Sequence, residues 1–162
     1  MLTIFLATAL ISSPAAAQSS VVVVVRHAET AGGGGDPILS DAGTARAYAL
    51  ANALKHAAVA AVYSTQYQRT RLTATPLADS LHLAVTAMTA ANPMQAHIDA
   101  IVAKVKENAG KTVVVVGHSN TVPMIIRALG GPDIGAIADT EYDNLFTLIT
   151  DSTGVRLIRS RY

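Results

Sequence analysis

The stretch that decides the fold is Val21-Val22-Val23-Val24-Val25, which runs directly into Arg26 and His27. Five valines are too few for a helix, and β-branched side chains favour an extended strand. A strand without polar alternation has both faces buried, which is typical of a parallel sheet covered by helices on both sides. The run therefore predicts a doubly buried strand that ends in an arginine and a histidine.

Further strands are predicted along the chain. Residues 112–116 repeat the valine-rich signal, and residues 60–63 are a weaker version of it. Residues 145–150 and 155–159 flank Asp151-Ser152-Thr153-Gly154, a turn sequence that predicts a hairpin.

Helical stretches lie between these strands. Ser40 is a candidate N-cap for an alanine-rich helix that reaches Ala57. Three more helices are expected over residues 69–81, 94–108 and 121–129, the last ending at two glycines. Alternating strands and helices predict an α/β fold, a three-layer α/β/α sandwich with a mostly parallel central sheet.

The first seventeen residues differ from the rest because they carry no charged side chain. An apolar run over residues 2–11 leads to Ala15-Ala16-Ala17, which resembles a signal peptide and its cleavage site, although the usual positive start is missing. We therefore expect residues 1–17 to be a signal peptide cleaved near Ala17, and residues 18–162 to form one domain. The protein would then be periplasmic or secreted, without a stable membrane anchor. A buried N-terminal element is the alternative.

Composition excludes several classes of protein. The chain has 162 residues, 51% of them hydrophobic, with a formal net charge of +1 and no cysteine. A chain this apolar is not disordered, and without cysteine it has no disulfide or zinc–thiolate scaffold. The near-neutral charge predicts no nucleic-acid partner. No spacing of His, Asp or Glu predicts a metal site, and we expect no cofactor. The oligomeric state does not follow from the sequence.

Polar residues follow three of the predicted strands directly. They are Arg26-His27, the segment from Ser64 to Arg69, and Gly117-His118-Ser119-Asn120. Open parallel sheets bind ligands beyond the carboxyl ends of their strands, so two histidines and two arginines should meet at one edge. Arginine donates forked hydrogen bonds to phosphate oxygens, and imidazole can attack phosphorus. The pattern predicts a phosphate-handling site.

These residues resemble the motifs of the histidine phosphatase superfamily, the phosphoglycerate mutase-like proteins, and the chain is similar to a small branch 1 member. Arg26-His27-Ala28 resembles the family's Arg-His-Gly, with alanine in place of glycine. Leu39 to Gly43 is similar to its Leu-Ser/Thr-x-x-Gly, and Ser64 to Ala74 to its Ser-x-x-x-x-Arg-x-x-x-Thr-Ala segment. Val116 to Ser119 resembles its second-histidine block.

The resemblance implies a phosphoglycerate mutase-like fold and a phosphoric monoester hydrolase. His27 would be the nucleophile that forms a phosphohistidine, Arg26 and Arg69 would hold the phosphoryl oxygens, and His118 would complete the pocket. The expected substrate is a small-molecule or glycan phosphomonoester.

The sequence offers three candidate residues for the general acid. Larger members supply a carboxylate from an insertion, but residues 82–93 contain no Asp or Glu. Glu29, two residues after the nucleophile, is the first candidate, followed by Asp36 and Asp143. A substrate with a good leaving group needs no strong acid.

Three alternatives stay open. The first is a protein phosphohistidine phosphatase, and the second is a non-catalytic phosphate-binding relative. The third is a serine hydrolase, because residues 117–121 echo a nucleophile elbow; Thr121 replaces its last glycine, and no histidine follows His118. The other side chains considered are expected to be structural or solvated: His56, His82, His97 and Arg71.

Overall fold

The computed structural model describes residues 19–162, and the signal peptide predicted over residues 1–17 lies outside this range. The described part contains six strands and four helices. In chain order they are β1 (Ser20–Arg26), α1 (Asp41–Leu54), β2 (Val59–Thr65), α2 (Gln68–Ser80), β3 (Val85–Met88), α3 (Met94–Lys106), β4 (Thr112–Gly117), α4 (Thr121–Ala128), β5 (Asn144–Asp151) and β6 (Gly154–Arg161).

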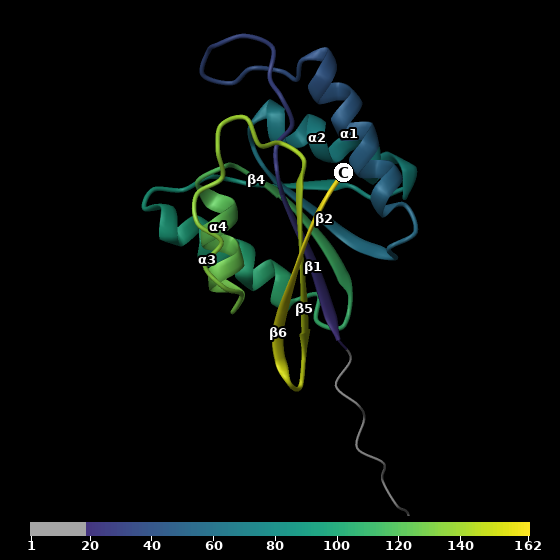
Figure 1. The fold of residues 1–162 in the computed structure, drawn as a ribbon, viewed down its shortest axis with the longest axis vertical. Coiled ribbons are helices and arrows are strands. Elements are labelled where there is room, and N and C mark those ends of the chain that lie inside the picture. The colour runs from purple at the N-terminus through teal and green to yellow at the C-terminus, as the bar shows by residue number, and fades with distance from the viewer. Residues whose placement is uncertain (1–18) are drawn as a thin grey trace, which may run out of the picture.

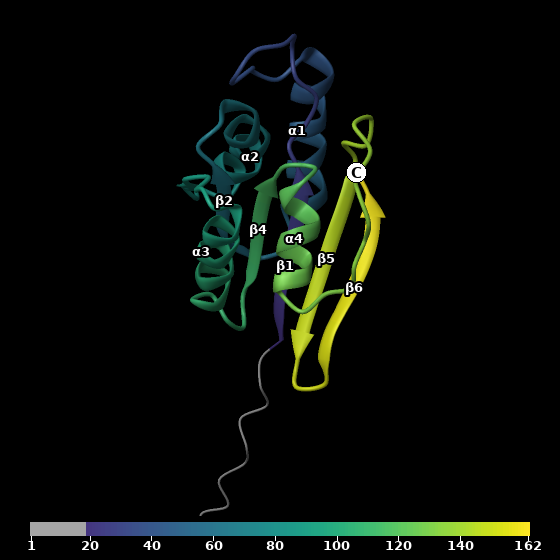
Figure 2. The ribbon, with the colours of Figure 1, turned by 90° about the vertical axis from the view of Figure 1, so that its left-hand side faces the viewer.

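The strands form one sheet in the order β3-β2-β4-β1-β5-β6. The first four are parallel neighbours, whereas β5 runs antiparallel to both β1 and β6. The β5–β6 hairpin forms one edge of the sheet, as Figure 2 shows. The mostly parallel sheet predicted from the valine runs is confirmed.

The valines of β1 divide between two hydrophobic cores because successive side chains of a strand point to opposite faces. Val22 and Val24 pack with residues of α3 and α4, whereas Val23 and Val25 pack with residues of α1 and α2. Helices thus cover both faces, with α1 and α2 on one side and α3 and α4 on the other (Figure 1). This is the predicted three-layer sandwich.

The structure adds one strand that the sequence analysis missed. β3 has four residues, Val85–Met88, and it lies at the sheet edge where none of its side chains is fully buried. Because it lacks both a buried run and a clear alternation, it leaves little trace in the sequence. It matters here because it directs the following segment toward the ends of the other parallel strands.

None of the helices in residues 19–162 has the length and apolar character needed to cross a membrane.

Candidate active site

A cavity of about 340 Å³ lies at the carboxyl ends of the parallel strands, within the size range of small-molecule sites. It is lined by side chains that follow β1, β2, β3 and β4. The lining residues are His27, Tyr67, Arg69, Ala90, Met94, His97, His118, Ser119, Asn120 and Thr121. The structure therefore brings His27, Arg69 and His118 together, and it leaves Arg26 and Glu29 outside the lining.

His27 is held in a defined orientation at the end of β1. Its backbone N–H donates to the carbonyl of Gly117 at 2.9 Å, which ties it to the end of β4. Its Nδ1 lies 2.8 Å from the carbonyl oxygen of Ala28, and a carbonyl only accepts, so Nδ1 carries the proton. The lone pair of the neutral ring is consequently on Nε2, the nitrogen that is left for attack on an electrophile.

His118 follows β4 and faces His27. The two ring centroids are 5.4 Å apart with an interplanar angle of 65°. Its Nε2 is hydrogen-bonded to Thr65 Oγ1 at 3.1 Å, and Thr65 Oγ1 lies 2.7 Å from Thr70 Oγ1. The ring of Tyr67 packs edge-on against it at 5.6 Å. Residues at the end of β2 thus fix the second histidine.

Both histidines are neutral in this site. Burial lowers the pKa of His27 to about 4, opposed by its hydrogen bond to Ala28 and assisted by the charges of Arg26 and Arg69. Burial, followed by the charge of Arg69, lowers the pKa of His118 to about 3. A neutral imidazole is the nucleophilic form, so the arrangement suits His27 to attack at neutral pH.

These pKa values predict that acid destabilises the fold before most carboxylates titrate. An unfolded histidine takes up a proton below its ordinary pKa of 6.5, whereas folded His27 and His118 do so only near 4 and 3. The unfolded state therefore binds more protons, and the free energy of unfolding decreases as the pH falls from about 6.5 toward 4. Urea unfolding between about pH 5 and 7.5 should show this decrease, and H118N should flatten it. His56→Asn is the control because His56 is exposed; an unchanged slope in H118N would contradict the expectation.

Arg69 is the cationic side chain of the cavity wall. It lies in the first turn of α2, where its guanidinium stacks over the Tyr67 ring at 4.5 Å. Asp36 Oδ1 lies 3.7 Å from Arg69 Nη1 and accepts from the backbone N–H of Gln68 at 2.8 Å. Stacking and ion pairing hold the guanidinium plane in place, which suits it to receive a tetrahedral oxyanion.

Arg26 is buried beneath a loop of the chain's last third. Its Nη1 donates to the backbone carbonyls of Ala138 at 2.8 Å, Asp139 at 3.1 Å and Glu141 at 3.3 Å. The ring of Tyr142 covers the guanidinium at 4.1 Å. The expected role of Arg26 on phosphoryl oxygens stays a prediction, because in this structure the side chain binds the loop.

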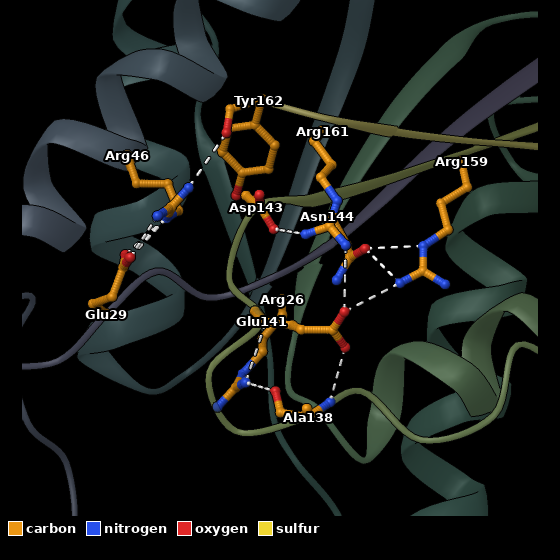
Figure 3. Close-up of polar contacts among 10 residues, drawn as sticks. All are labelled: Arg26, Glu29, Arg46, Ala138, Glu141, Asp143, Asn144, Arg159, Arg161 and Tyr162. Carbon is orange, nitrogen blue, oxygen red and sulfur yellow. Dashed lines mark hydrogen bonds and ion pairs between the residues drawn. The ribbon is translucent and has the colours of Figure 1, made fainter.

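That loop is held by a group of ion pairs (Figure 3). The Glu141 carboxylate accepts from the backbone N–H of Ala138 at 3.1 Å and contacts Arg159 at 3.4 Å and Arg161 at 3.5 Å. Asp143 pairs with Arg161 at 2.5 Å. The β5–β6 hairpin thereby fixes the loop over Arg26, and Asp143, one of the acid candidates, is paired there and outside the cavity lining.

Glu29 does not have the surroundings of a general acid. Its carboxylate accepts three hydrogen bonds of 2.6–2.9 Å from Arg46 of α1, as Figure 3 also shows. These bonds hold the pKa of Glu29 below its usual range, so the group is an anion at neutral pH. A general acid needs the opposite shift. The hypothesis that Glu29 donates the proton stays a prediction; in this structure the side chain fixes α1 to the segment after His27. Asp36 is occupied by Arg69 and Gln68 and does not line the cavity.

Gly43 of the Leu39–Gly43 segment has a clear packing reason. A Cβ atom at this position would come within 2.0 Å of the Glu29 carbonyl oxygen. That carbonyl also accepts from the backbone N–H of Ser40 at 3.0 Å, and Ser40 Oγ accepts from the Gly43 N–H at 3.1 Å as the N-cap of α1. The start of α1 is thus docked on the backbone beside His27.

The structure also adds side chains that the sequence analysis did not single out. His97, expected to be structural or solvated, is 1% exposed and lines the cavity, whereas His56 and His82 are exposed as expected. The spacing of Met94, Ile98, Ile101 and Val105 marks the buried face of α3 and places His97 beside it. This periodicity is the feature of the sequence that could have indicated that His97 is buried.

Residues 19–162 contain no group of three His, Cys, Asp or Glu side chains arranged to hold a metal ion.

An open α/β sheet that gathers two neutral imidazoles and a stacked arginine beyond its strand ends defines a phosphate-handling protein of the histidine-dependent kind. Residues 22–95 match the family model of the histidine phosphatase superfamily (branch 1).

Solved structures of several phosphatases share the fold. A mycobacterial glucosyl-3-phosphoglycerate phosphatase is 16% identical, with a TM-score of 0.67 over 89% of this chain and 98% of its own. The protein histidine phosphatase SixA, solved with tungstate, is 18% identical, with a TM-score of 0.69 over 87% and 96% of the two chains. At these identities the similarity establishes the fold alone. A comparison with curated protein sequences gives no match.

Proposed function

We propose that the protein is a phosphatase that hydrolyses a phosphomonoester through a phosphohistidine on His27. The observation that supports this proposal is the state of His27. Its ring is neutral, and its Nδ1–H donates to the Ala28 carbonyl. It lines the same cavity as Arg69 and His118. In the first step a bond forms between Nε2 and phosphorus, the P–O bond breaks, and the departing alkoxide takes a proton from solvent. In the second step water attacks phosphorus and gives up a proton to solvent, the P–N bond breaks with its electron pair returning to Nε2, and phosphate leaves.

Charge stabilisation in both steps falls to Arg69. Its fixed guanidinium can donate two hydrogen bonds to phosphoryl oxygens, and this is the main demand of phosphoryl transfer. His118, held by Thr65, borders the same space. The role of Arg26 on the phosphoryl group is part of the proposal and requires its release from the loop carbonyls, at least in part.

No aspartate or glutamate within residues 19–162 lines the cavity. The departing alcohol oxygen therefore receives no proton from a carboxylate in this arrangement, and substrates with good leaving groups should react fastest. This observation favours a second candidate, a protein phosphohistidine phosphatase, whose imidazole leaving group needs less help.

A leaving-group series tests the proposal. For wild-type protein we expect kcat/KM to fall steeply as the pKa of the leaving alcohol rises, from p-nitrophenyl phosphate to alkyl phosphates, because general-acid help of about 10²–10⁴ is missing. Glu29→Gln should show the same slope, because Glu29 is bound to Arg46. Phosphohistidine in a peptide is assayed beside the series to separate the two candidates. Absence of turnover on every compound would leave a non-catalytic phosphate-binding protein.

Export is a further proposal that rests on the sequence of residues 1–17 alone. It would place the enzyme among small phosphate esters or glycan phosphates outside the cytoplasm.

A further inference from the structure

His97 is a buried imidazole that the reaction described above does not use. It lies in the first turns of α3 and is 1% exposed. It is one of the residues that line the cavity, together with Ala90, Met94, His27 and Arg69. A substrate bound in this cavity can therefore come into contact with His97.

One nitrogen of His97 is already occupied. Nδ1 lies 3.1 Å from the carbonyl oxygen of Thr89, the residue that follows β3. Since the carbonyl accepts, Nδ1 carries the proton, and the neutral ring presents an acceptor at Nε2. The tautomer of His97 is thus set in the same way as that of His27.

The other nitrogen is without a partner. Nε2 of His97 is buried and has no hydrogen-bond partner within residues 19–162. Buried polar atoms are satisfied in most proteins because an unpaired one costs free energy, so an exception beside a cavity calls for a ligand that pairs with it. A phenylalanine would fill the same space at the boundary of the α3 core without that cost.

Nε2 is buried, so a substrate group reaches it only after a neighbouring side chain moves. Met94 precedes His97 by one helical turn, lines the same cavity and is partly buried, so the two side chains lie on one face of α3. Methionine is unbranched and flexible, and it adapts its shape to a ligand. A shift of Met94 is the simplest way for a substrate group to reach the ring.

We infer that His97 is a specificity-determining residue whose Nε2 accepts a hydrogen bond from a hydroxyl on the alcohol part of the substrate. The substrate class is then a phosphomonoester whose leaving group carries a further hydroxyl. This inference rests on the proposed phosphatase function and names its substrate class.

The test compares substrates that differ in one hydroxyl but have similar leaving groups. The probes are phenyl phosphate and the three isomers of (hydroxymethyl)phenyl phosphate, assayed as kcat/KM on the full chain. Wild type should prefer at least one isomer over phenyl phosphate by about tenfold or more, the size expected for one hydrogen bond to a buried group. His97→Asn keeps a donor for the Thr89 carbonyl and removes the Nε2 acceptor, so it should abolish the preference. Phenyl phosphate should change less than threefold.

His97→Gln is the matched variant, because its longer amide places an acceptor close to the Nε2 position and should restore part of the preference. Thermal unfolding of each variant confirms that it is folded. A preference that survives in His97→Asn, or an equal loss on all four probes, overturns the inference. These outcomes differ from failure of the proposed function, in which wild type would not hydrolyse phenyl phosphate at all.

Discussion

Replacing His27 by asparagine should reduce phosphomonoester turnover by roughly 10⁴-fold or more, the scale of loss when an enzyme loses its nucleophile. Asparagine can still donate to the Ala28 carbonyl, as Nδ1 does at 2.8 Å, but it has no equivalent of the Nε2 lone pair. The strand end and the hydrogen bond from the residue 27 N–H to Gly117 should stay intact. The loss would thus report on chemistry and not on folding.

Two measurements complete this experiment. Rapid-quench labelling with a ³²P-phosphoester should trap an acid-labile, base-stable adduct on wild type and none on H27N. His56→Asn, at an exposed position, is the matched control and should behave as wild type. Activity of H27N within tenfold of wild type, or an adduct that persists in it, would rule out His27 as the nucleophile.

Arg69→Ala is expected to lower kcat/KM by about 10²–10³-fold, the usual effect of removing one preorganised donor from a developing charge. Arg69 supplies the only arginine or lysine side chain of the cavity lining within residues 19–162. Arg69→Lys should recover little of this loss, because lysine keeps the charge but not the forked geometry or the stacking on Tyr67.

Inhibition by inorganic phosphate provides an independent readout of the same residue. The inhibition constant should rise in both Arg69 variants, since the product contacts the same donors. Arg71→Ala is the control, because Arg71 lies two positions further on α2 and is exposed. Equal effects of the Arg69 and Arg71 substitutions would show a general influence of charge near the site and would contradict a specific contact.

The parts of the fold that could be predicted are those with strong local patterns. The valine runs of β1 and β4 are buried on both faces. Their composition alone therefore predicted that they are strands and that helices cover both faces of the sheet. His27 and His118 were found because each directly follows such a run, and parallel strands end at one edge. Arg69 followed from its place just after β2.

What could not be predicted depends on contacts between distant segments. The pairing of Glu29 with Arg46 spans 17 positions and is set by the docking of α1, so it could not be predicted from the nearness of Glu29 to His27 in sequence. The loop over Arg26 comes from 112–115 positions further along the chain. The role of His97 depends on β3, a strand too short and too exposed to predict.

The position of β1 in the sheet governs when the protein becomes active during its synthesis. β1 leaves the ribosome first, yet its two neighbours are β4, which pairs Val21 with Thr112, and β5, which pairs Ser20 with Thr150. The strand that carries His27 therefore has no partner until most of the chain has been made, and such distant pairings form slowly. His27 and His118 meet only when β4 docks, and the loop that binds Arg26 arrives later still. A nascent chain stalled before β4 would contain His27 but lack His118, and the site would be incomplete.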